Sequence, residues 1–131
     1  MKLQTKFVVY YFPAVVLTIV IFILSALSSG TFKAFNLSDL LALDKVGHCL
    51  AYLSLSFFYY FGFIKSKNRK PAFKEILWIL LACSLYGILL EFCQLYFFSS
   101  RCFEILDMIA NATGALLGVI IGFYLVKPKI N

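Results

Sequence analysis

The sequence predicts an all-α integral membrane protein, a small bundle of four transmembrane helices. Two observations lead to this fold class. First, 63% of the 131 residues are hydrophobic and only 14% are charged, which is more apolar surface than a water-soluble domain of this length can bury. Second, residues 7–32 and 108–126 contain no charged side chain, and apolar stretches of ~18 residues or more match the thickness of a hydrocarbon core. We expect one domain over residues 1–131.

Four spans are predicted, at about residues 7–28, 44–64, 76–98 and 105–126. The first resembles a signal peptide, because lysines precede it and Ala26-Leu27-Ser28 resembles a cleavage site. Its apolar run is longer than the ~7–15 residues of a signal peptide, and three more spans follow. We therefore expect it to remain as a transmembrane helix.

The distribution of basic residues predicts the orientation. Nine Lys and Arg residues lie on the side of the two termini and the loop at 65–75, against three on the other side. By the positive-inside rule, both termini are expected in the cytoplasm. The basic residues behind the net charge of +6 then set the orientation and contact anionic lipid head groups. No nucleic-acid partner is therefore expected.

Polar side chains converge in the outer third of the predicted bundle. At ~1.5 Å per helical residue, they come out within about 12 Å of the outer face. Ionisable groups that face lipid cost several kcal/mol each, so we expect these side chains to face one another. The set comprises Asp44, Lys45, His48 and Tyr52 in the second span, Glu91 and Gln94 in the third, Arg101 in the following loop, and Asp107 and Asn111 in the fourth.

Within each span these residues recur every three or four positions, so each group shares one helix face. We expect Arg101 to form a salt bridge with Glu91 or Asp107, and His48 to lie within hydrogen-bond reach of a carboxylate. A purely structural lock between helices is the alternative to a functional site. Acids, an arginine and a histidine are costly for a lock, which favours a site.

Three glycines, Gly114, Gly118 and Gly122, recur every four residues in the last span. Such a stripe lets a second helix approach closely, either within the chain or in a homodimer. The four cysteines show no metal-ligand spacing, and the single histidine lacks an HExxH-like partner. We therefore expect no metal site and no cofactor.

The segments DKVGHCLAY and EFCQLYFFSSRCFEILDMIANATGALLG resemble the paired signature of the VanZ-like family. The resemblance implies a small multi-pass protein of the bacterial plasma membrane and cell envelope, with a link to teicoplanin-type glycopeptide antibiotic resistance. The residues that match the signature are Asp44, Lys45, His48, Tyr52, Glu91, Gln94, Arg101, Asp107, Asn111, Gly114 and Gly118.

Three functions remain open from the sequence. The first is a binding or envelope-modulating protein whose polar layer holds an amphiphilic or lipid-linked ligand. The second is a membrane enzyme that acts on a lipid head group, with His48 as general base and Arg101 stabilising negative charge. The third is a small transporter subunit, which would need to oligomerise. No catalytic residue is assigned, and no nucleophile elbow, P-loop or dinucleotide motif is present.

Overall fold

The computed structural model describes residues 3–27, 37–97 and 105–129, which within these ranges form four α-helices and no strand. All four helices are long and apolar enough to cross a membrane, so the predicted all-α, four-span architecture is confirmed. The helices are α1 (Leu3–Leu27), α2 (Leu37–Lys67), α3 (Phe73–Phe97) and α4 (Ile105–Leu125).

The helix bounds differ most from the predicted spans at the start of α2. That helix begins at Leu37, whereas the span was predicted from residue 44. The apolar segment of α2 does begin close to the prediction, at Leu43. The difference arises because residues 37–42, in which Ser38 and Asp39 are the two polar residues, are helical too.

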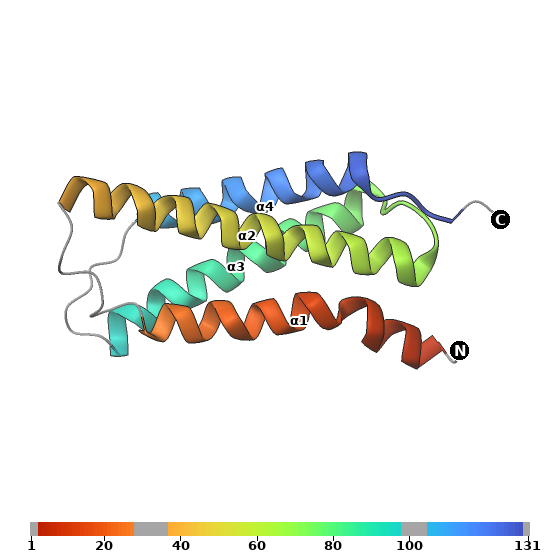
Figure 1. Cartoon of the computed structure of the whole chain (residues 1–131), viewed down its shortest axis with the longest axis horizontal. Coiled ribbons are helices and arrows are strands. Elements are labelled where there is room, and N and C mark those ends of the chain that lie inside the picture. The colour runs from red at the N-terminus through yellow and green to blue at the C-terminus, as the bar shows by residue number, and fades with distance from the viewer. Residues whose placement is uncertain (1–2, 28–36, 98–104, 130–131) are drawn as a thin grey trace.

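The helices run back and forth along one long axis (Figure 1). The start of α1, the end of α4 and the turn between α2 and α3 lie together at one end, on the right of the figure. We call this the basic end, because the described residues there include Lys65, Lys67, Arg69, Lys70, Lys74, Lys127 and Lys129. The end of α3 and the start of α4 lie at the opposite end.

At the basic end, Asn68 joins the turn after α2 to the segment after α4. Asn68 has a positive φ of 53° and donates its backbone N–H to the carbonyl of Ile64 at 2.8 Å, a common way for a helix to end. Its side-chain oxygen accepts a hydrogen bond from the backbone N–H of Lys129 at 2.7 Å. The C-terminal segment is therefore held against the turn between α2 and α3.

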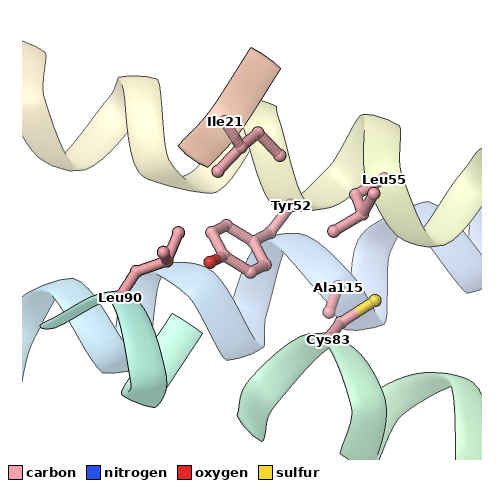
Figure 2. Close-up of a cluster of buried hydrophobic side chains, with 6 residues drawn as sticks. All are labelled: Ile21, Tyr52, Leu55, Cys83, Leu90 and Ala115. Atoms are coloured by element: carbon pink, nitrogen blue, oxygen red, sulfur yellow. The ribbon is translucent and has the colours of Figure 1, made fainter. Parts of the chain in front are cut away.

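The core of the bundle centres on the ring of Tyr52. Figure 2 shows this ring projecting from α2 between side chains of the other three helices. Its neighbours in the cluster are Ile21 of α1, Leu55 of α2, Cys83 and Leu90 of α3, and Ala115 of α4. A second apolar cluster, formed by Tyr60, Ile64, Val119 and Val126, fills the half of the bundle nearer the basic end.

Helices α2 and α4 pack against each other through the glycine stripe. A Cβ atom built at Gly114 would lie 2.1 Å from the carbonyl oxygen of Cys49, and one at Gly118 would lie 2.1 Å from that of Leu53. At Gly122 it would lie 2.7 Å from the ring of Tyr60. The stripe thus packs α4 on α2 within the chain. At Gly114 and Gly118, backbone carbonyl groups of α2 occupy the space that a side chain would need.

We predict that Gly118→Ala lowers the melting temperature of the detergent-solubilised protein. The added methyl group would overlap a backbone carbonyl, so the helices must separate, and overpacking of this kind typically costs about 1–3 kcal/mol. The matched control is Gly47→Ala on α2, where an added Cβ meets nothing within 4 Å. We call this close contact between α2 and α4 the seam. An equal change of melting temperature in both variants would contradict it.

The orientation in the membrane stays a prediction: the basic end in the cytoplasm and Arg101 outside. In a variant without native cysteines, Lys70→Cys should be protected from a membrane-impermeant thiol reagent added to intact cells, and Arg101→Cys should be labelled. Labelling after cell lysis controls for reactivity. The reverse pattern would show that the basic end faces outward.

Candidate functional site

Polar side chains from α2, α3 and α4 gather at the end of the bundle opposite the basic end. Because the helices alternate in direction, the first half of α2, the end of α3 and the start of α4 occupy the same level (Figure 1). We use the name polar cluster for the residues found there: Asp44, Lys45, His48, Tyr52, Glu91, Gln94, Asp107 and Asn111.

Two side-chain pairs cross the seam between α2 and α4. The ammonium group of Lys45 donates to Oδ1 of Asp107 at 2.7 Å. One turn deeper, Nδ1 of His48 lies 3.1 Å from Oδ1 of Asn111. An amide oxygen only accepts hydrogen bonds, so this contact places a proton on Nδ1 of the imidazole. Each helix thus presents to the other two polar side chains that lie about one helical turn apart.

The second ring nitrogen of His48 faces Asp44. Nε2 lies 3.8 Å from Oδ1 of that carboxylate, which is within ion-pair range and too long for a hydrogen bond. Among the described residues, the expected hydrogen bond between His48 and a carboxylate is therefore not formed. The ring is instead bonded through Nδ1 to Asn111, which the close packing of α4 on α2 brings to it.

Exposure falls steadily with depth in the cluster. The side chain of Asp44 is 32% exposed and that of His48 is 19% exposed, whereas Tyr52, one turn further along α2, is 1% exposed. Asp107 is buried although Lys45, its partner, remains partly exposed. The cluster is therefore accessible at its outer edge and closed beneath.

The buried floor lies where α3 meets Tyr52 and Asn111. A Cβ at Gly87 would lie 2.8 Å from Nδ2 of Asn111 and 3.2 Å from the hydroxyl of Tyr52, so the glycine makes room for both side chains. The Tyr52 hydroxyl is buried and has no hydrogen-bond partner among the described residues. Glu91, one turn along α3 from Gly87, is also buried.

Gln94 connects the cluster end of α3 to α1. Its amide nitrogen donates to both the backbone carbonyl, at 3.0 Å, and the hydroxyl, at 2.7 Å, of Ser25. Ser25 was not among the residues selected from the sequence. Its position near the end of the first span puts it at the depth of Gln94, and this was the only signal that pointed to it.

The structure thus brings eight of the nine predicted site residues to one end of the bundle. The ninth, Arg101, lies outside the described residues, and so does its expected salt bridge. Sequence reasoning did not identify Lys45 as the partner of Asp107. Depth alone could have suggested it, since both residues lie near the same end of the bundle.

The described residues offer one group suited to holding a metal ion. One ligand atom from each of Asp44, His48 and Asp107 lies within 4.8 Å of the other two. The thiols of Cys49, Cys83 and Cys93 are free and do not belong to this group.

Comparison with known proteins gives one match. A family model described as VanZ/LLP1 matches residues 5–127, in agreement with the resemblance carried by the two sequence segments. No curated protein and no solved structure matches the chain at a significant level.

We predict that Lys45 and Asp107 stabilise each other strongly. Removing one member of a buried ion pair leaves the other charge uncompensated, at a cost of about 3–5 kcal/mol in a fully buried pair, and less here because Lys45 is partly exposed. A double-mutant cycle with Lys45→Met and Asp107→Leu, followed by thermal unfolding, should show the double variant more stable than the sum of the single losses implies.

The exposed pair between Arg69 and Glu75 at the basic end provides the matched control, and its cycle should show a much smaller coupling. Equal coupling in the two cycles would mean that the Lys45–Asp107 pair behaves as an ordinary surface contact.

Proposed function

Since the chain belongs to the VanZ/LLP1 family, we propose that it is a multi-pass protein of a bacterial plasma membrane whose polar cluster binds an amphiphilic or lipid-linked envelope ligand. The head group would contact the outer edge of the cluster, and the acyl chain would lie along the apolar helices. Binding there would alter access to the cell surface, which links the protein to resistance against teicoplanin-type glycopeptides.

The observation that carries this proposal is the fall in exposure across the cluster. Asp44, Lys45 and His48 offer a carboxylate, an ammonium group and an imidazole at the accessible edge. The floor beneath them is closed by the buried Tyr52 and Asn111. Polar groups at an accessible edge suit a polar head group, and the closed floor leaves the apolar outer surface of the helices as the place for an acyl tail.

An enzyme acting on the same head group is the second candidate function. The feature that favours it is the fixed ring of His48, held through Nδ1 by Asn111 with Nε2 turned toward Asp44. An imidazole oriented by a hydrogen bond can act as a general base. Turnover of a lipid substrate by the purified protein would favour this candidate over simple binding.

Transport is less well supported. The polar cluster occupies one end of the bundle, while Tyr60, Ile64, Val119 and Val126 pack into an apolar cluster in the other half. A pathway through one chain would have to cross this packing, so transport would require an assembly of several chains.

We predict that His48→Asn and Glu91→Gln each abolish the teicoplanin resistance that the protein confers, while the abundance of the protein in the membrane stays near normal. Both changes remove an ionisable group and keep a side chain that forms hydrogen bonds. The measurements are teicoplanin susceptibility of a bacterium that expresses the protein, the lipids that copurify with it by mass spectrometry, and its abundance in membranes.

The control is Glu75→Gln, the same chemical change at the basic end, which should retain the phenotype. If abundance and melting temperature fall in step with activity in the cluster variants, the cluster is a structural lock and the proposal fails.

A further inference from the structure

The polar cluster contains three side chains arranged as a metal site. We propose that Asp44, His48 and Asp107 together bind a divalent transition-metal ion, of which Zn²⁺ and Mn²⁺ are the best matches. Their ligand atoms lie within 4.8 Å of one another, and two of them come from one face of α2 while the third comes from α4.

The donor set indicates the class of metal. Imidazole nitrogen and carboxylate oxygen are both zinc ligands, and carboxylate oxygen also suits manganese. Magnesium and calcium prefer oxygen ligands only, and calcium takes six to eight of them. Three protein ligands would leave further coordination positions for water or for an anionic head group.

The spacing between His48 and Asp44 fits a bridging ion. The 3.8 Å between Nε2 and Oδ1 is too long for a hydrogen bond. A metal ion bonds to each such ligand atom at about 2.0–2.2 Å, so it can sit between two atoms at this separation. Asp44 is only half-buried, and its side chain can adjust as the ion binds.

Asn111 prepares His48 to act as a ligand. The amide oxygen accepts from Nδ1 at 3.1 Å, so the neutral imidazole carries its proton on Nδ1. Its lone pair is then on Nε2, the atom that faces Asp44. Metal-binding histidines are usually held in this way, with the second nitrogen donating to a carbonyl or carboxylate.

Lys45 competes with the metal for Asp107. Its ammonium group contacts Oδ1 of that carboxylate at 2.7 Å, and a lysine so close repels a divalent ion. The carboxylate has a second oxygen that can serve as ligand, so Lys45 weakens binding without blocking it. A metal site therefore implies that removing the lysine charge tightens metal binding, which a structural lock does not imply.

This proposal goes beyond the lipid-binding function and differs from the expectation of no metal drawn from the sequence. The two metal ligands on α2 are four residues apart, which alone is common on any helix. Only the close packing of α4 on α2 brings Asp107 to them. The proposal shares residues with the proposed function but is independent of the ligand's identity.

The test uses the full chain, purified in detergent and freed of metal with a chelator. Zn²⁺ alone is titrated by calorimetry, and Mn²⁺ alone is followed by electron paramagnetic resonance, since Mn²⁺ prefers oxygen and nitrogen ligands to thiols. We expect one saturable site per chain. Asp44→Asn and His48→Asn should each weaken binding about tenfold or more, and Glu75→Gln at the basic end should leave it unchanged.

Lys45→Met should tighten Mn²⁺ binding, by about tenfold. Asp44 is the most accessible of the three ligands, so Asp44→Asn is expected to fold. The test therefore stays decisive even if a variant at a more buried ligand fails to fold. Absence of saturable binding, or binding that is unchanged in both Asp44→Asn and His48→Asn, would overturn the metal site. Since no lipid is added, that result would leave the lipid and susceptibility measurements to decide the proposed function separately.

Discussion

The backbone contact between α2 and α4 is the constraint on which the rest of the structure depends. At Gly114 and Gly118 there is no space for even one methyl group against the carbonyl oxygens of Cys49 and Leu53. In a membrane, burial from water does not drive helices together, so close packing must supply the attraction. Every polar contact between Asp107 or Asn111 and α2 is made within two turns of this seam, and each would lengthen if the seam opened.

The same contact explains why charged groups are tolerated at this depth. Lys45 and Asp107 would each cost several kcal/mol if they faced lipid alone, and their pairing across the seam reduces that cost. Their helices can approach only because Gly114 and Gly118 stand where larger residues would collide, about two and three turns beyond Asp107. Fold and candidate site thus depend on successive positions of α4. Asp107 and Asn111 supply the polar contacts, and Gly114 and Gly118 allow the two helices to approach.

Much of this arrangement follows from the sequence, and its limits have physical causes. Apolar length predicts the four helices, and alternating direction places Asp44, Glu91 and Asp107 at one level. Periodicity shows which residues share a helix face, but it does not show which partner each one meets across the seam. For that reason the sequence offers Glu91 or Asp107 as the partner of Arg101 and does not single out Lys45, whose ammonium group contacts Asp107. The glycine stripe likewise fits helix packing within the chain or in a homodimer. Only the short distances from the glycine Cβ positions to the backbone of α2 place it against that helix.

The incomplete satisfaction of the polar cluster bears on whether it is only a structural lock. Buried polar groups in proteins nearly always have hydrogen-bond partners, and a network that serves stability alone is expected to close its bonds. Here the pairs Lys45–Asp107 and His48–Asn111 are closed, whereas the Tyr52 hydroxyl has no partner among the described residues. The gap between His48 and Asp44 is likewise wider than a hydrogen bond. The Tyr60 hydroxyl, in the other half of the bundle, has no partner among the described residues either, so a buried hydroxyl of this kind does not by itself mark a site. The gap between His48 and Asp44 lies at the accessible edge of the cluster, and this is where another molecule or ion can bind.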